Sequence, residues 1–149
     1  MLEITRARGK YRGRNAGTKY NGFAWAVATD QTDSPDMYTQ TKISLVEIDR
    51  VLAELGTDKT RLINATVYIT DIALKDQMER AWLEWIGDDP ANWPQRACVE
   101  TGLKGATQVE IVVIAACAER HHGGQTPRFV TEGSQTKTCI LDGRATWLP

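Results

Sequence analysis

The spacing of the apolar residues changes along this chain, and that change restricts the fold more than any other sequence feature. Over residues 37–55 the apolar positions recur every three or four residues, and Gly56 follows where a helix cap belongs. Residues 74–86 repeat the same pattern. We therefore predict two amphipathic helices, the first with Ser34 or Asp36 as its N-cap.

Five other segments are rich in β-branched, aromatic or alternating apolar residues, which is typical of strands. The pair Asn21-Gly22 predicts a hairpin turn, with residues 4–12 as the partner strand. Pro90 and Pro94 predict a non-helical link after the second helix. The order β-β-α-β-α-β-β is packed most simply as an α+β domain with both helices on one face of a mixed or antiparallel sheet. The predicted strands are residues 4–12, 20–29, 62–70, 96–100 and 109–118.

The C-terminal residues differ in character from the rest of the chain. Residues 121–125 form a polar, Gly-rich linker, and an Asp142-Gly143 pair separates two short apolar segments. We predict an α+β domain over residues 1–118 and a linker with a β-hairpin over residues 119–149. A lone hairpin is marginally stable in water, so we expect its own domain or a neighbouring subunit to cover it.

Composition excludes several classes of protein. A formal net charge of -1 and a pI near 6.1 give no general reason to bind nucleic acid, although basic residues crowd the N-terminus. Three cysteines, Cys98, Cys117 and Cys139, are too widely spaced to suggest a disulfide framework or a zinc site. No apolar run approaches the roughly 20 residues that cross a bilayer. We expect a cytoplasmic protein that has no membrane association.

No motif for a bound metal or nucleotide cofactor is found in the sequence. The zinc-deaminase signature, the P-loop, the dinucleotide fingerprint and the G-x-S-x-G elbow are all missing. The only histidines, His121 and His122, are adjacent in the Gly-rich stretch, where we expect surface positions. We therefore predict that neither a metal nor a cofactor takes part.

Two charged residues in strand contexts are candidates for chemistry. Arg96 follows Pro94 at the start of a predicted strand, where its guanidinium could hold a carboxylate through paired hydrogen bonds. The alternative is an ordinary surface arginine. Glu110 lies in a run apolar enough to be buried on both faces, so it needs either a basic partner or a raised pKa that suits proton transfer. The residues alone leave both alternatives open.

Other residues near these two could shape a pocket. Cys98 follows Arg96 by two positions, so both side chains face the same way on a strand. Without a histidine base nearby, we interpret the thiol as pocket wall, although a neighbouring arginine could lower its pKa. Trp25 and Trp93 could border the pocket, whereas the second helix's tryptophans fit its buried stripe.

Taken together, these elements resemble the YjgF/RidA family. The similar segments are LVEIDRVLAELG, INATVYITD, WLEW, WPQRACVE and VEIVVIAA, which span most of residues 22–116. The resemblance implies a chorismate-mutase-like fold and a homotrimer whose sheets form a central barrel, with pockets between subunits. It also implies hydrolytic deamination of an enamine or imine carboxylate, with Arg96 binding the carboxylate and Glu110 positioning water.

The resemblance extends to the substrate pocket but includes departures. Tyr20 is at the end of a segment, GTKY, that stands in the region of the family's G-P-Y-S. Ala24-Trp25-Ala26-Val27 replaces the family's Ser-Gly-Gln, and Glu79 stands where many members have asparagine. We therefore predict a substrate site of Tyr20, Glu79, Trp25, Trp93 and Cys98 with the two charged residues, for a substrate other than the smallest imino acids.

Other functions remain open at this point. An aminomuconate-type intermediate of aromatic degradation is one alternative substrate. A trimer that binds a small carboxylate without turnover is a second possibility. Nucleic-acid binding or ribonuclease activity is supported only by the basic N-terminal run, which equally well protects an edge strand from unwanted pairing.

Overall fold

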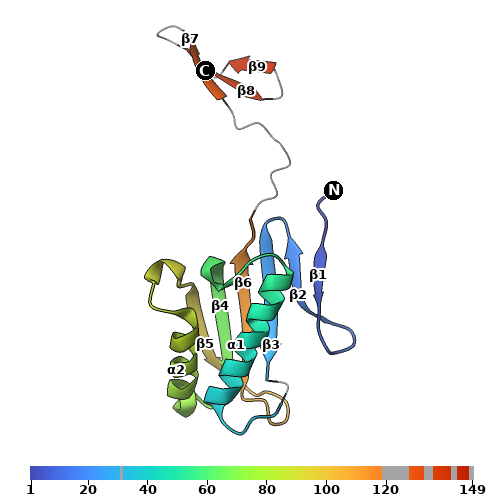
Figure 1. Cartoon of the computed structure of the whole chain (residues 1–149), viewed down its shortest axis with the longest axis vertical. Coiled ribbons are helices and arrows are strands. Elements are labelled where there is room, and N and C mark those ends of the chain that lie inside the picture. The colour runs from blue at the N-terminus through green and yellow to red at the C-terminus, as the bar shows by residue number, and fades with distance from the viewer. Residues whose placement is uncertain (31, 119–127, 133–135, 142–143, 148–149) are drawn as a thin grey trace. The chain divides into compact units, whose positions relative to one another are not determined.

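The computed structural model describes residues 1–30, 32–118, 128–132, 136–141 and 144–147 (Figure 1). The chain divides into two compact units, Met1–Ala118 and Glu119–Pro149. No helix among the described residues is long and apolar enough to cross a membrane.

The first unit is a mixed six-stranded sheet with both helices on one face (Figure 1). The strand order is β1-β2-β3-β6-β4-β5, and only the β4–β5 pair is parallel. This confirms the predicted α+β class with both helices on one face. The elements are β1 (Thr5–Arg8), β2 (Asn15–Tyr20), β3 (Phe23–Thr29), α1 (Met37–Glu54), β4 (Leu62–Ile69), α2 (Lys75–Ile86), β5 (Gln95–Glu100) and β6 (Val109–Ala116).

The predicted hairpin turn is present, but its partner strand was assigned wrongly. Asn21 and Gly22 have φ of 49° and 80°, the left-handed values that a two-residue turn needs. The strand before this turn is β2, which pairs with β3, whereas β1 pairs only with β2. The β2 sequence NAGTKY has no apolar alternation, so it was not predicted as a strand.

Local signals fix the ends of the helices. The N-cap of α1 is Asp36, whose side chain accepts a hydrogen bond from the Thr39 backbone N–H at 2.8 Å. Ser34 instead donates its backbone N–H to Asp30 at 2.8 Å. Short 3-10 helices, Lys59–Arg61, Ile72–Leu74 and Pro90–Asn92, join the main elements, so the link containing Pro90 is helical in part, contrary to our prediction.

The core lies between the helices and one face of the sheet. Side chains from α1, α2 and the middle strands are almost completely buried there, including Ile48, Leu52, Met78, Val67 and Ile111. Gly17 of β2 lies directly under α1, and a Cβ there would clash with Val51 and would approach the Trp25 carbonyl to 2.8 Å. A glycine therefore allows β2 to pack under the helix.

None of the described helices lies on the other face of the sheet. Strand β6 alternates strictly, with Val109, Ile111 and Val113 buried and Glu110 and Val112 only half-buried. The prediction that Glu110 lies in a strand buried on both faces is therefore wrong. Apolar side chains remain exposed on this face, among them Phe23, Trp25 and Val99 at 42%, 37% and 41%.

The second unit contains a three-stranded antiparallel sheet rather than the two strands that we predicted. β7 (Arg128–Glu132) pairs with β8 (Thr136–Leu141), which pairs with β9 (Arg144–Trp147). The predicted hairpin corresponds to β8 and β9. Its Asp142-Gly143 turn and the linker at residues 121–125 lie outside the described residues.

Candidate functional site

Arg96 lies on the helix-covered face of the sheet, at its β5 edge. The parallel β4–β5 register pairs Arg96 with Ala65, a fully buried core residue, so the two side chains share a face. On that face, Arg96 Nη2 donates to Glu79 Oε2 of α2 at 2.6 Å. The guanidinium carbon lies 4.9 Å from the centroid of the Trp82 ring. The side chain is held between an acid and an aromatic ring.

One nitrogen of the guanidinium has no partner in the described part of the chain. Arg96 Nη1 is buried and has no hydrogen-bond partner among the described residues. A buried donor that lacks an acceptor costs about 1 to 3 kcal/mol. The Arg96 side chain as a whole is only 17% exposed. This arrangement favours a further acceptor, from a ligand or from another copy of the chain, that completes the site.

Cys98 lies beside Arg96 but has no sign of an activated thiol. It pairs in register with Val67, so it also faces the helices, as its sequence spacing predicted. Burial raises the pKa of Cys98, and the charge of Glu79 raises it further, against the opposing influence of Lys75 and Arg96. A thiol with a raised pKa is mostly protonated at neutral pH, so the geometry favours a wall position over a nucleophile.

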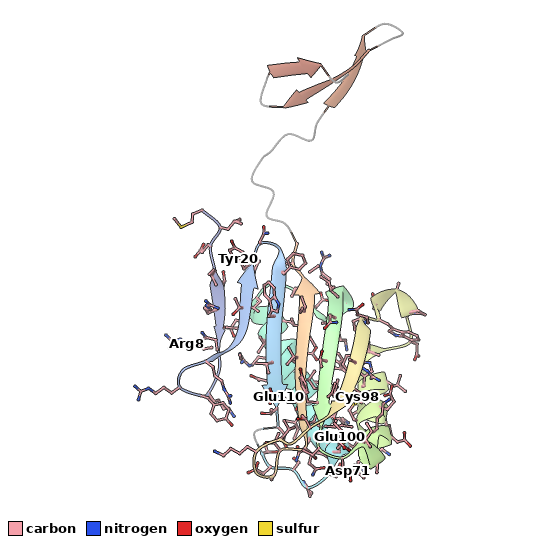
Figure 2. The ribbon with its side chains drawn as sticks, turned by 180° about the vertical axis from the view of Figure 1, so that it is seen from behind. Arg8, Tyr20, Asp71, Cys98, Glu100 and Glu110 are labelled. Atoms are coloured by element: carbon pink, nitrogen blue, oxygen red, sulfur yellow. The ribbon has the colours of Figure 1, made fainter. Side chains whose placement is uncertain are left out.

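Glu110 lies on the opposite face of the same sheet. Its register partners are Thr29 of β3 and Tyr68 of β4, so these three side chains share the face away from the helices. Glu110 is labelled in Figure 2, which views the sheet from this side. Glu110 has no ion pair or side-chain hydrogen bond with any residue that the structure describes. Within one chain, Arg96 and Glu110 therefore cannot face the same small molecule.

A cavity of about 330 Å³ lies against Glu110, between the β1–β2 loop, the end of β3 and α1. This volume is within the range of small-molecule sites. The basic N-terminal run was interpreted as support for nucleic-acid binding or as protection of an edge strand, so these lining residues were not predicted. Besides Glu110, the polar side chains that line the cavity are those of Lys10, Tyr11, Arg14, Asn15, Thr29 and Glu47.

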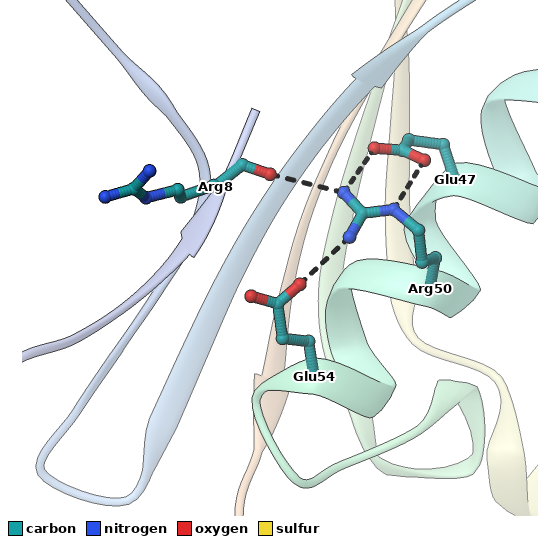
Figure 3. Close-up of polar contacts among 4 residues, drawn as sticks. All are labelled: Arg8, Glu47, Arg50 and Glu54. Atoms are coloured by element: carbon teal, nitrogen blue, oxygen red, sulfur yellow. Dashed lines mark hydrogen bonds and ion pairs between the residues drawn. The ribbon is translucent and has the colours of Figure 1, made fainter. Parts of the chain in front are cut away.

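An ion-pair network ties this loop to α1 (Figure 3). Arg50 Nη2 donates to Glu47 Oε1 at 2.7 Å, and its Nη1 donates to Glu54 Oε2 at 2.9 Å. The same Nη2 lies 3.4 Å from the carbonyl oxygen of Arg8, the last residue of β1. The hydrogen bond from Arg50 lowers the pKa of Glu47 despite partial burial, and the charge of Lys10 adds to this.

Within one chain, three aromatic residues predicted for the site lie apart from Glu110. Tyr20 pairs with Phe23, which pairs with Ala116, whereas Glu110 pairs with Thr29 at the other end of β3. Figure 2 shows Tyr20 and Glu110 at opposite ends of the sheet. Trp25 is on the open face, four positions from Thr29, with its ring 6.1 Å from that of Phe23. The Trp93 indole donates to the Gly87 carbonyl at 2.8 Å.

Candidate metal ligands do not gather in the described part of the chain. No group of three or more His, Cys, Asp and Glu side chains there could hold a metal ion. The two histidines fall outside the described residues, so their predicted surface position remains a prediction.

Comparison with known proteins identifies relatives over the first unit. Residues 20–117 match the family described as Endoribonuclease L-PSP. A RutC family protein of Haemophilus ducreyi is 46% identical over 99 residues, which is 65% of this chain and 83% of the relative. The RutC family protein YoaB of Escherichia coli is 30% identical over 98 residues, 65% of this chain and 84% of the relative.

Solved structures agree with this fold. A putative translation initiation inhibitor of Salmonella typhimurium has 31% identity and a TM-score of 0.69, covering 78% of this chain and 99% of that chain. A YjgF family member of Neisseria meningitidis has 28% identity and a TM-score of 0.71, covering 78% and 97%. These neighbours have the chorismate-mutase-like fold expected from the sequence. The chain therefore belongs to the Endoribonuclease L-PSP family, which is the YjgF/RidA family that its sequence resembles.

Proposed function

We propose that this protein hydrolyses an enamine or imine carboxylate and releases ammonia, at a site that two copies of the chain share. The observation that carries the proposal is that Arg96 and Glu110 lie on opposite faces of the sheet. Arg96, with unpaired Nη1 donors, lies on one face, and Glu110, with no basic partner among the described residues, lies on the other. One copy supplies the carboxylate clamp, and its neighbour supplies the acid.

Arg96 fits the first role because its position is fixed. Glu79 and the Trp82 ring hold the guanidinium in place, so little side-chain entropy remains to be lost when a carboxylate binds. The Nη1 donors then bind one carboxylate oxygen. Charge-assisted hydrogen bonds of this kind contribute about 1.5 to 3 kcal/mol each.

Glu110 fits the second role because it faces a cavity and is half-buried. In the ionised form it accepts a hydrogen bond from water and removes a proton as the water oxygen bonds to the C=N carbon. The C=N π electrons move to nitrogen, which takes up a proton from solvent; an enamine first forms this imine by moving a proton from nitrogen to its β-carbon. Protonated Glu110 then gives its proton to the amine nitrogen, and the remaining O–H proton passes to solvent as the C=O bond forms. The C–N bond breaks, which releases ammonia and leaves a ketone or aldehyde.

The open face of the sheet supports an assembly of several copies. Phe23, Trp25 and Val99 remain exposed on a face that none of the described helices covers. The family resemblance suggests three copies around a barrel, with a cleft where the β5 edge of one chain meets the open face of the next. Light scattering tests this: a mass of three chains at micromolar concentration is expected, and a monomer contradicts the shared site.

Ammonia release from imines generated in situ by an amino-acid oxidase tests the activity. We expect faster release with the protein than without it, and loss of that acceleration in both Arg96→Ala and Glu110→Gln. Glu3→Gln is the matched control, because Glu3 is exposed and lies before β1. If no imine is hydrolysed faster by folded protein, the deaminase proposal fails. An aminomuconate-type substrate requires a separate assay with that compound.

A binding function without turnover is the second candidate, and the Arg96–Glu79 pair favours it. At 2.6 Å the Glu79 carboxylate already occupies Nη2, so Arg96 can offer only part of its guanidinium. A trimer that binds a small carboxylate would then need Arg96 but not Glu110. Carboxylate binding that survives Glu110→Gln, with no ammonia from any imine, identifies this function.

A further inference from the structure

We infer that the substrate carries a second acidic group, and that Lys10 and Arg14 of the β1–β2 loop bind it. The inference rests on the proposed function for the reacting end of the molecule. Binding of the second acidic group does not depend on turnover, because it can be measured with unreactive compounds. The resulting substrate class is a dicarboxylate enamine or imine.

The cavity beside Glu110 brings these residues together. Lys10, Arg14 and Glu110 all line the same space of about 330 Å³. A molecule whose reacting carbon lies at Glu110 therefore extends toward the two basic residues. This volume is more than the smallest imino acids need and suits a longer compound with a polar far end.

The charge balance of the cavity favours an anion. Its charged lining residues are Lys10, Arg14, Glu47 and Glu110. Arg50 already holds Glu47 through two hydrogen bonds, at 2.7 and 2.9 Å. Neither Lys10 nor Arg14 forms an ion pair with any described residue, although the charge of Lys10 reaches Glu47 and lowers its pKa. Two cations are thus left for a ligand.

The loop that carries them is anchored at its base. Arg50 binds the carbonyl oxygen of Arg8, and a Cβ on Gly9 would lie 3.1 Å from the backbone nitrogen of Ala16. The two ends of the loop therefore lie in close contact. The Arg14 guanidinium lies 4.6 Å from the centroid of the Tyr11 ring, which also lines the cavity. This stacking restricts the arginine before a ligand binds.

Equilibrium binding of two unreactive five-carbon acids tests the inference. Glutarate has two carboxylates and pentanoate has one, so their difference isolates the second acid. Calorimetry on the full chain should show that glutarate binds roughly three- to tenfold more tightly, which is the range for partly exposed charges. The preference should disappear in Lys10→Gln/Arg14→Gln and should weaken as salt is added.

Arg8→Gln/Arg12→Gln is the matched control. It removes the same charge from the last residue of β1 and from the same loop, but neither residue lines the cavity, and Figure 3 shows the Arg8 side chain pointing away from the network. This control should keep the glutarate preference. Equal affinity for the two acids, no glutarate binding at millimolar concentration, or equal loss in both double variants overturns the inference.

The two proposals fail in distinguishable ways. Imine hydrolysis without a preference for glutarate leaves the deaminase function standing and removes the dicarboxylate inference. Glutarate binding that depends on Lys10 and Arg14, with no ammonia from any imine, supports the second-acid site and removes the deaminase function.

Discussion

The β5 edge and the Glu110 cavity belong to one sheet but are built in different ways. At the β5 edge, Arg96 is held by Glu79 and lies over Trp82, mostly shielded from solvent. At the cavity, Glu110 is half-buried and shares the lining with the basic side chains of a loop. A group buried among packed side chains can hold a fixed ligand position. A group under a loop leaves room for water and for substrate variation.

Removing the acid of the cavity should have the largest effect. Glu110→Gln keeps the size of the side chain but cannot accept a proton, so we expect the rate of ammonia release to fall about 100- to 10,000-fold. The midpoint of thermal unfolding should change little, because Glu110 has no ion pair with the described residues. A rate within threefold of wild type, a change of roughly 0.6 kcal/mol in the activation barrier, would mean that another residue acts as the acid.

The second test removes the hydrogen bonds that Gln40 makes near the start of β6, the strand that carries Glu110. Gln40 is buried in α1, donates to the carbonyls of Ser34 and Ala106 at 2.7 and 2.9 Å, and accepts from Gln108 N–H at 2.7 Å. Gln40→Ala should lower the free energy of unfolding by about 2 to 4 kcal/mol, measured in urea. Because Gln108 precedes β6, ammonia release should fall more than Arg96-dependent carboxylate binding does.

A matched control on the neighbouring helix separates these hydrogen bonds from general damage. Gln77 of α2 accepts one long hydrogen bond, at 3.4 Å from Tyr38 N–H. Gln77→Ala should cost less than about 1 kcal/mol. If the two variants are equally unstable, the hydrogen bonds of Gln40 do not stabilise the segment before β6.

The third test weakens the ion pair between Glu79 and Arg96 at the β5 edge. Glu79→Gln removes the charge that competes with a substrate carboxylate, so we expect binding to tighten roughly three- to tenfold, seen as a lower KM. Glu84→Gln, on the same helix and 49% exposed, should leave KM unchanged. Weaker binding in Glu79→Gln would mean that the acid positions the guanidinium more than it competes.

The smallest effect concerns pH and the network under the loop. Hydrogen bonding to Arg50 lowers the pKa of Glu47 below the ordinary value of 4.5, so ionisation stabilises the folded state above that pH. This contribution is lost as pH falls through the lowered pKa. Wild type should exceed Glu47→Gln in unfolding free energy by less than about 1 kcal/mol near neutral pH, and the difference should vanish in acid. A difference independent of pH would contradict this origin.

Local sequence signals predicted most of the fold. Helical spacing, an Asp36 cap, Gly56 after the helix and the Asn21-Gly22 turn each act within a few residues, and the structure contains all of them. Strand β2 was missed, because its residues owe their strand state to pairing with β3 and to Gly17 under α1 rather than to apolar alternation. Burial of Glu110 was overestimated for a related reason, since the run of apolar neighbours does not reveal which face stays open.

The sequence by itself determined the two helices, most strands of the first unit, the family and the two charged residues proposed for the chemistry, because these depend on local patterns and motifs. Only the tertiary structure decided that Arg96 and Glu110 face opposite sides of the sheet, that Glu79 holds Arg96, and that Lys10 and Arg14 border the cavity of Glu110. Strand register and helix packing set those relations, and they join residues far apart in the chain whose spacing carries no record of the contact.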